Sequence, residues 1–203
     1  RHLLSLSSGL AQDVKNIQGH DPAADDIYQH VVDSLPLTSA PGSQFRYGPS
    51  HYYAFGVLLQ RKLEAAGLDY NPLEYLEATI LDKIGLKYED WIHDPSGNPH
   101  LPNGCSITPR EWVKFGRFLL QKGNWNGEQI VDSTLIKELF VHDGPNPGHG
   151  KFVWLNTQDG YGAYQVMAAP PGSPGGFMYY DGMNEIIGAL GAGKNRMYII
   201  PSM

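Results

Sequence analysis

Apolar residues recur at helical spacing through much of the first three quarters of the chain. Between residues 50 and 66, Ala54, Val57 and Leu58 form an apolar stripe, and Gly67 follows as a stop signal. Residues 71–74, Asn-Pro-Leu-Glu, have the order of an N-cap, a first-turn proline and a capping-box glutamate. These patterns predict helices over residues 2–7, 25–34, 50–66, 72–83, 109–121 and 133–141.

After residue 150 the pattern changes to short apolar segments separated by glycine, proline, asparagine or aspartate. It predicts strands over residues 151–155, 176–180, 186–190 and 196–200. Helices first and strands later is the order of an α+β fold, not the regular alternation of a doubly wound sheet. We therefore expect a single partial domain over residues 1–203, with a mainly helical and loop part at 1–150 and a sheet part at 151–203.

Composition narrows the class of protein. Apolar residues make up 41% and charged residues 18% of the 203 residues, as in a folded chain with a core. The formal net charge is −6 and no basic run occurs, which argues against a nucleic-acid partner. No apolar run approaches the roughly 18 residues of a membrane span. A single cysteine excludes an internal disulfide and any multi-cysteine metal site.

One glycine-rich stretch nearly matches a phosphate-binding loop. Residues 188–194 read Gly-Ala-Leu-Gly-Ala-Gly-Lys, but Asn195 stands where the magnesium-binding serine or threonine belongs. The next residues, 196–200, predict a strand, whereas a phosphate-binding loop leads into a helix N-terminus. We therefore interpret the stretch as a glycine-rich strand edge or a tight hairpin.

Histidine and cysteine give no metal or thiol site by pattern. None of the eight histidines has the spacing of a metal-binding motif. His93 and His100 flank one loop and His142 and His149 share another, so we interpret them as solvated loop residues. Cys105 precedes a predicted helix start, and we interpret it as a half-buried structural residue rather than a reactive thiol.

Tyr47 lies on a predicted turn immediately before the helix at 50–66, with Ser50 as the simplest N-cap. A phenol at such a place can point into a cleft, and positive charge nearby would lower its pKa toward that of a useful base. On position alone, the simpler alternative is that Tyr47 packs beneath the helix.

Five segments, in order along the chain, resemble one family. They are residues 1–10 (RHLLSLSSGL, resembling RHLLSHTSGL), 41–47 (PGSQFRY, resembling PGxxFxY), 80–86 (ILDKIGL, resembling IFxPLGM), 107–116 (ITPREWVKFG, resembling LTPRDxxxFG) and 123–131 (GNWNGEQIV, resembling GxWxGxxIV). Together they resemble the serine β-lactamase/penicillin-binding-protein-like superfamily. The likeness is greatest to its class C β-lactamase-related branch, with esterases, D-amino-acid peptidases and 6-aminohexanoate-oligomer hydrolases. The resemblance implies a β-lactamase/transpeptidase-like α+β fold, with an antiparallel sheet packed against a mainly helical region and incomplete at both ends.

The resemblance carries over to a few residues. Tyr47 matches the family tyrosine, which there moves protons to and from the nucleophile and the leaving group. Pro49 stands where the family has a substrate-binding asparagine, which weakens a β-lactam interpretation. Gly191, Ala192 and Gly193 lie where the family's third motif, Lys-Thr-Gly or His-x-Gly, is expected on a strand at the edge of the cleft. They would contribute backbone only, with the Ala192 N–H as one oxyanion donor.

The family nucleophile is missing from these residues. Its Ser-x-x-Lys motif would lie several tens of residues before Arg1, and no Ser-x-x-Lys occurs in the 203 residues. The sequence begins without methionine and stops after a predicted strand. We therefore expect a fragment, a processed chain or an incomplete sequence, and we cannot read a compartment from it, although many relatives are periplasmic or secreted.

Two functions follow as hypotheses. The first is a serine hydrolase that cleaves a small ester or amide through an acyl-enzyme, with no metal or organic cofactor. Pro49, His51 and Trp91 are further candidates for substrate contact, and Tyr52, Trp125 and Trp154 join Trp91 as candidates for an acyl pocket or, alternatively, for core and loop anchors. The second is a non-catalytic module with the same fold that binds or regulates. The oligomeric state is open.

Overall fold

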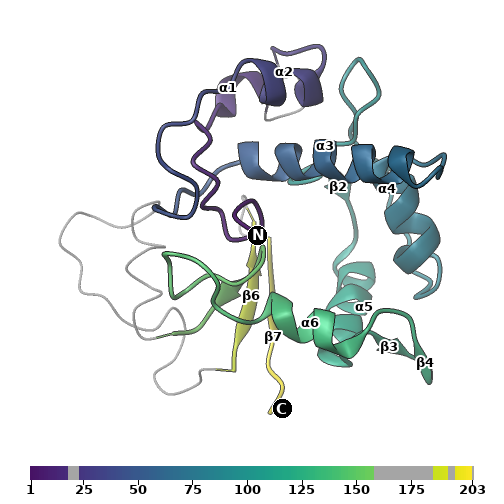
Figure 1. Cartoon of the computed structure of the whole chain (residues 1–203). Helices are drawn as coiled ribbons and strands as arrows, with labels where there is room; N and C mark the ends of the chain where they lie inside the picture. The colour runs from purple at the N-terminus through teal and green to yellow at the C-terminus, as the bar shows by residue number, and fades with distance from the viewer. Residues whose placement is uncertain (18–22, 158–184, 192–194, 203) are drawn as a thin grey trace. The chain divides into compact units, whose positions relative to one another are not determined.

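The computed structural model describes residues 1–17, 23–157, 185–191 and 195–202. The helices precede the three-stranded sheet along the chain, as expected for an α+β fold, but two short strand pairs that were not expected lie between the helices (Figure 1). The helices are α1 (Val14–Ile17), α2 (Ile27–Asp33), α3 (Ser50–Ala65), α4 (Pro72–Leu76), the π-helical η1 (Glu77–Leu81), α5 (Pro109–Leu120) and α6 (Ser133–Leu139). The strands are β1 (Asp90–Trp91), β2 (Cys105–Ser106), β3 (Asn124–Trp125), β4 (Glu128–Gln129), β5 (Trp154–Leu155), β6 (Ile187–Leu190) and β7 (Arg196–Ile199).

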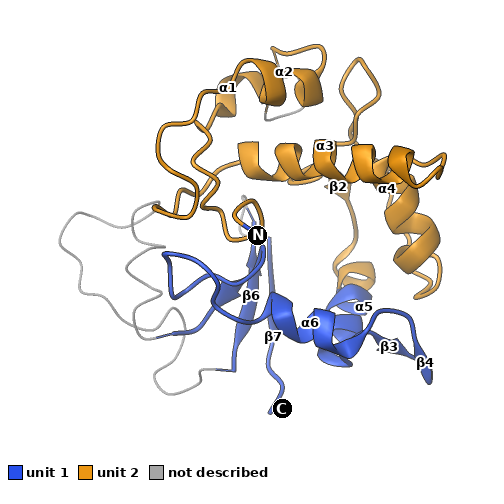
Figure 2. Ribbon diagram, viewed as in Figure 1, with its two compact units in different colours: residues 1, 113–203 blue, residues 2–112 orange. Residues whose placement is uncertain are grey.

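Contacts within the chain define two compact units. The first along the chain is His2–Trp112, drawn in orange and labelled unit 2 in Figure 2. The second is Val113–Met203 together with Arg1, drawn in blue and labelled unit 1 there. The boundary therefore lies inside α5, whose first residues belong to one unit and whose last residues belong to the other. The change from helices to strands near residue 150 lies instead within the second unit.

The core of the first unit lies where α2 packs against α3 (Figure 1). Tyr53 and Val57 of α3 meet a buried face of α2, with Ala54 partly buried beside them. Leu58, which we expected in the apolar stripe, is 46% exposed, so that expectation was wrong. The stripe that is buried follows the i, i+4 spacing of Tyr53 and Val57, because residues one position apart face different sides of a helix.

Side-chain caps fix the starts of several helices. The Asn71 side chain accepts from the backbone N–H of Leu73 (2.8 Å) and Glu74 (3.0 Å), and the Glu74 carboxylate accepts from the Asn71 N–H (2.7 Å). This capping box confirms the predicted helix start. The helix continues as expected to Leu81, but its last turn is η1, where π-type hydrogen bonding replaces the α pattern.

The helix expected at residues 2–7 is wrong, because this segment forms buried turns instead. Leu6 has a left-handed φ of 52°, and Gly9 has a φ of 83°, which suits glycine. The carbonyl of Ser7 accepts from Gly42 N–H (2.7 Å) and that of Leu6 accepts from Arg46 N–H (2.9 Å). Bonds to residues some forty positions away thus satisfy carbonyls that a helix would have used locally.

The second unit contains the three-stranded antiparallel sheet β5-β6-β7. Trp154 pairs with Gly188 across β5 and β6, and Gly188 pairs with Tyr198 across β6 and β7. Strands β6 and β7 confirm the predictions at 186–190 and 196–200. The strand predicted at 151–155 forms only at its last two residues, Trp154 and Leu155, and the one predicted at 176–180 lies outside the described residues. Buried residues from the helices and the sheet fill the unit: Phe118, Leu119, Ile136, Trp154, Leu155, Ile187 and Ile199.

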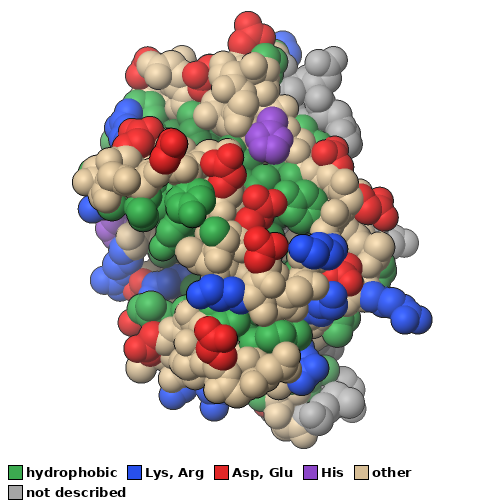
Figure 3. Space-filling model, turned by 90° about the vertical axis from the view of Figure 1, so that its right-hand side faces the viewer, with side chains coloured by type: hydrophobic (Ala, Val, Ile, Leu, Met, Phe, Trp, Pro, Cys, Tyr) green, Lys and Arg blue, Asp and Glu red, His purple; other side chains and the backbone are tan. Residues whose placement is uncertain are grey.

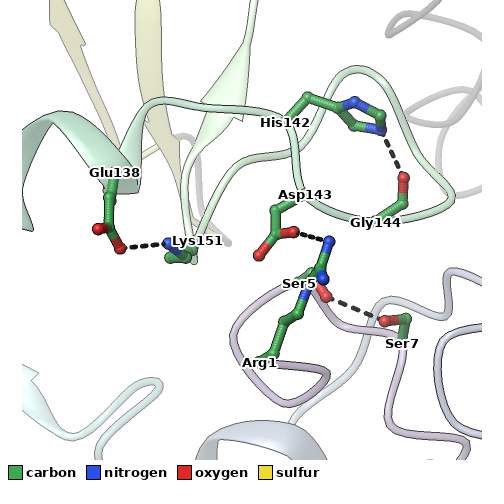
Figure 4. A network of polar contacts seen from close by, with 8 residues as sticks. All are labelled: Arg1, Ser5, Ser7, Glu138, His142, Asp143, Gly144 and Lys151. Atoms are coloured by element: carbon green, nitrogen blue, oxygen red, sulfur yellow. Dashed lines mark hydrogen bonds and ion pairs between the residues drawn. The ribbon is translucent and has the colours of Figure 1, made fainter.

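Ion pairs attach loop residues at the surface of this unit. Arg1 pairs with Asp143, and Lys151 pairs with Glu138 of α6 at 2.9 Å (Figure 4). The first contact explains why Arg1 groups with the second unit rather than with the residues that follow it. Figure 3 shows one face on which acidic and basic side chains are intermingled. In the part of the chain that the structure describes, no helix has the length and apolarity to cross a membrane.

Candidate functional site

Tyr47 lies on the segment that leads into α3, and its side chain is half-buried. Pro49 is the N-cap of α3 and Ser50 is its first residue, so the expectation that Ser50 is the N-cap was wrong. The capping acceptor comes from elsewhere in the chain, because the side-chain oxygen of Gln12 accepts from the Ser50 N–H at 3.1 Å. Tyr47 is thus three residues from a helix start that the N-terminal segment holds in place.

The Gln12 side-chain amide is fixed at both ends. Its Oε1 accepts from Ser50 N–H, and its Nε2 donates to the Leu10 carbonyl at 3.0 Å. A donor at one end and an acceptor at the other leave only one orientation of the amide. Gly48 lies against it, since a Cβ added to Gly48 would be 2.1 Å from Gln12 Oε1. The residue after Tyr47 is therefore packed so closely that a side chain does not fit.

His51, on the first turn of α3, is fully buried in this region. Its Nδ1 lies 2.8 Å from Ser8 Oγ, and its Nε2 lies 2.7 Å from the Arg46 carbonyl oxygen. Gln12 Nε2 is 3.0 Å from the same imidazole nitrogen. Burial lowers the pKa of His51, and the hydrogen bond to the Arg46 carbonyl opposes this only in part, so the imidazole is held neutral.

Tyr52 follows His51 in the chain, and its pKa is influenced by the neighbouring Tyr47. Its pKa is raised, first by burial and then by the nearby Tyr47 phenol. The neighbouring Tyr47 phenol opposes ionisation of Tyr52, because two negative charges side by side would repel each other. A proton is consequently retained on Tyr52 at neutral pH.

Of the other candidates for substrate contact, Pro49 is buried and Trp91 is half-buried. Pro49 contributes its carbonyl, which accepts from Tyr52 N–H at 3.0 Å. The Trp91 indole N–H donates to the His100 carbonyl at 3.0 Å, and its ring meets Tyr88 edge to face at 5.5 Å between centroids. Both residues thus anchor their own loops in this structure.

The remaining aromatic candidates lie in the second unit. Trp154 is 3% exposed and meets His149 edge to face at 5.1 Å between centroids, so it is a core anchor. The Arg117 guanidinium lies 5.0 Å from the centroid of Trp125. That contact is a cation–π pair between α5 and β3.

The glycine-rich stretch joins two strands of the second unit. Leu190 pairs with Arg196, and Gly191 N–H donates to the Asn195 carbonyl at 2.7 Å. This hairpin confirms the interpretation from sequence and contradicts a phosphate-binding loop, because strand β7 follows where a helix N-terminus would be needed. Ala192 and Gly193 lie outside the described residues.

The interpretation of the loop histidines was right for two and wrong for two. His93 and His142 are exposed, whereas His100 and His149 are buried. His100 Nδ1 is 3.2 Å from the Tyr53 hydroxyl and His149 Nδ1 is 2.8 Å from the Gly150 carbonyl. A polar ring that finds such partners is tolerated inside a core, which loop position alone does not reveal.

Cys105 is half-buried. Burial raises the pKa of the Cys105 thiol to about 11, as expected for a half-buried structural cysteine. Within residues 1–17, 23–157, 185–191 and 195–202, no three of the His, Cys, Asp and Glu side chains form a group that could hold a metal ion.

No local pattern in the sequence predicted that Ser8 and Gln12 would contact the helix that follows Tyr47. Both lie about forty residues before His51, in a segment expected to be helix and loop. No spacing rule links residues at that separation. The only signal was that residues 1–10 and 41–47 both belong to the set of family-like segments.

Comparisons with known proteins bear on the fold. No protein-family model matches the sequence, and no curated protein matches it. Among solved structures, a protein assigned as a 6-aminohexanoate-dimer hydrolase from Bacillus anthracis matches with a TM-score of 0.65 at 19% identity, over 98% of this chain and 52% of its own. A protein assigned as a β-lactamase from Bacteroides dorei DSM 17855 matches with a TM-score of 0.68 at 17% identity, over 100% of this chain and 60% of its own.

A third structure, the D-amino acid amidase from Ochrobactrum anthropi SV3, matches with a TM-score of 0.50 at 18% identity, over 77% of this chain and 53% of its own. The chain thus spans between about half and three fifths of the length of these structures. At such identities the likeness establishes the fold. This chain has the fold of the serine β-lactamase/penicillin-binding-protein-like superfamily and accounts for part of it.

Proposed function

We propose that this chain is part of a serine hydrolase that cleaves a small ester or amide by acyl transfer. What supports the proposal is that Tyr47 lies just before the start of α3 and ends the segment 41–47, which resembles the family motif that carries a proton-transferring tyrosine. The backbone on both sides of it is anchored, by Arg46 N–H on Leu6 and by Ser50 N–H on Gln12. A catalytic side chain needs such fixed surroundings to meet its substrate in one geometry.

The proposed chemistry has two half-reactions. The serine of a Ser-x-x-Lys motif, outside this sequence, attacks the substrate carbonyl, and its proton passes to the lysine and Tyr47 pair. The bond to the leaving group breaks as that pair returns the proton to the departing alcohol or amine. Water then attacks the acyl-enzyme by the same route and releases the acid. Backbone N–H groups, with Ala192 as one, stabilise the oxyanion in each step.

The substrate class rests on the neighbours and on one substitution. A 6-aminohexanoate dimer and a D-amino acid amide both contain an amide bond, which favours small amides and related esters. Pro49 offers no side-chain amide at the position of the family's asparagine, which speaks against a β-lactam. We therefore place non-lactam amides and esters first.

A second candidate is a non-catalytic module with the same fold that binds or regulates. Proline at residue 49 and the lack of lysine and histidine at residues 191–193 are the substitutions that favour it. A chain that has lost catalysis is free to lose such groups, because a fold does not by itself imply an activity.

The test uses the full-length protein that carries this chain and a fluorophosphonate serine probe. For a hydrolase, intact mass should increase by one probe unit, and small esters or amides should be turned over. For a non-catalytic module, no adduct and no turnover should occur, and the proposal fails.

Tyr47→Phe tests the proposed proton transfer in the same protein. We expect turnover to fall by about 10²-fold or more, the usual scale of general acid–base catalysis. Tyr70→Phe is the matched control, because Tyr70 is 40% exposed and lies after α3, away from the turn with Tyr47. Wild-type turnover in Tyr47→Phe would contradict the role of this residue.

A further inference from the structure

We propose that His51 is a positioning residue for Tyr47, which acts by donating its Nε2–H to the Arg46 carbonyl. The inference rests on the proposed hydrolase function, and it deepens that function by assigning a residue that supports the proton-transferring phenol. Its basis is the buried set of contacts that joins Ser8, Gln12, Arg46 and His51.

The partners of the imidazole determine where its proton lies. A carbonyl oxygen only accepts, and Nε2 is 2.7 Å from the Arg46 oxygen, so Nε2 carries the hydrogen. Nδ1 then accepts from the Ser8 hydroxyl at 2.8 Å, and Ser8 Oγ in turn accepts from the Leu10 N–H at 3.2 Å. Every one of these groups has a complementary role when His51 is neutral.

Gln12 competes with the Arg46 carbonyl for the same imidazole nitrogen, because its side-chain NH2 has a second hydrogen and lies within hydrogen-bond distance of His51 Nε2. Its Nε2 already donates to the Leu10 carbonyl, and at 3.0 Å from His51 Nε2 it is farther away than the Arg46 oxygen. The opposite tautomer would direct an imidazole lone pair at a carbonyl oxygen 2.7 Å away, which is repulsive. The Arg46 carbonyl is therefore the partner that we assign to His51 Nε2.

The Arg46 carbonyl and the Tyr47 nitrogen belong to one planar peptide group. Fixing the direction of the carbonyl therefore fixes the direction in which the chain enters Tyr47. Leu6 holds the preceding peptide group of Arg46 (2.9 Å), and the contact with Gln12 confines Gly48 on the other side. His51 donates directly to the carbonyl of the peptide group between Arg46 and Tyr47.

The experiment compares His51→Gln with His51→Asn in the full-length protein. The longer Gln amide can place a donor near Nε2, facing the Arg46 carbonyl, whereas Asn reaches only as far as Nδ1. We expect His51→Gln to keep kcat within a few-fold, and His51→Asn to lower kcat by about tenfold or more, since small misplacements of a catalytic group are costly. KM should be nearly unchanged in both variants, because His51 is buried away from substrate.

Two controls separate positioning from loss of stability. His100 is also fully buried, with Nδ1 3.2 Å from the Tyr53 hydroxyl, so His100→Asn disturbs the same unit without touching the turn with Tyr47. It should leave kcat unaffected. In a Tyr47→Phe background, His51→Asn should cause no further loss, since a residue that acts through Tyr47 has nothing left to position. Equal losses in both His51 variants, or additive losses with Tyr47→Phe, would overturn the proposal.

A second readout keeps the inference separate from the proposed function. Nitrogen-15 NMR of the imidazole in the 203-residue chain should show hydrogen on Nε2, and His51→Asn should shift the Tyr47 ring resonances while His51→Gln leaves them close to wild type. Hydrogen on Nδ1, or Tyr47 resonances that ignore both variants, would refute the positioning role. NMR can show hydrogen on Nε2 and the expected shifts of Tyr47 while the full-length protein neither binds the probe nor cleaves esters or amides. In that case the proposed hydrolase activity is refuted, and the positioning of Tyr47 by His51 is retained.

Discussion

Gly48→Ala should destabilise the chain by displacing the side chain of Gln12. An added Cβ would lie 2.1 Å from Gln12 Oε1 and 2.6 Å from its Cδ and Cγ, well inside van der Waals contact. The backbone of Gly48 is not in the left-handed region, so alanine can adopt its conformation there. The cost therefore comes from the neighbour that has to move and not from the φ of residue 48.

The magnitude follows from the bonds that Gln12 would lose. It accepts from Ser50 N–H at 3.1 Å and donates to the Leu10 carbonyl at 3.0 Å. Two such bonds contribute about 1 kcal/mol each. Replacing glycine restricts the unfolded chain and offsets roughly 0.4–1 kcal/mol of that. We expect a net loss of about 1.5 kcal/mol in the free energy of unfolding, equivalent to a Tm lower by about 3–6 °C.

A double-mutant cycle isolates the contact. Gln12→Ala already removes both hydrogen bonds and the atoms that an alanine at 48 would meet. In that background Gly48→Ala should be neutral or slightly stabilising, which gives a coupling energy of about 2 kcal/mol. Urea unfolding followed by circular dichroism measures all four proteins, with equal m values expected. If Gly48→Ala costs the same with and without Gln12, the reasoning from this contact is wrong.

Two further predictions concern other parts of the first unit. Asp94 is buried, and its carboxylate accepts from Ile27 N–H (2.8 Å), Asn98 N–H (2.8 Å) and Asn98 Nδ2 (2.9 Å). Asp94→Ala should therefore lower the free energy of unfolding, measured with urea, by about 3 kcal/mol or more. A decrease of less than about 1 kcal/mol would contradict this account. The Cys105 pKa of about 11, against an ordinary 9.0, should slow its reaction with a disulfide reagent at pH 8 by about 100-fold relative to the unfolded chain. Since the unfolded thiol ionises first, stability should decline as pH rises from about 9 to 11, a decline that Cys105→Ala should remove.

Local signals in the sequence were sufficient where a structure is stabilised by near neighbours. The capping box of Asn71 and Glu74 is complete within four residues, and it forms as predicted. The glycine-rich stretch before Arg196 was recognised as a hairpin because alternation and glycine are themselves the local causes of such a turn. The α+β order and the family-like segments likewise anticipated the fold that the structure shows.

The same local reasoning failed where distant residues satisfy the backbone. Residues 2–7 have the composition of a short helix, yet the carbonyls of Leu6 and Ser7 bond to Arg46 and Gly42, and the last three residues of the segment are buried. Ser50 has the residue type of an N-cap, yet its own N–H is capped by Gln12. In both cases a tertiary partner offered the same hydrogen bonds in another geometry, together with burial that a local helix or cap does not provide.

The candidate site likewise depends partly on local signals and partly on tertiary contacts. The sequence by itself determined that Tyr47 precedes a helix, because the signals for that helix depend on residues adjacent in the chain. Only the tertiary structure decided that His51 is fully buried, and that Ser8 and Gln12 contact its imidazole. Bringing residues about forty positions apart together costs chain entropy, so such contacts form only where tertiary packing offsets that cost. Here the packed arrangement holds the segment on which Tyr47 lies.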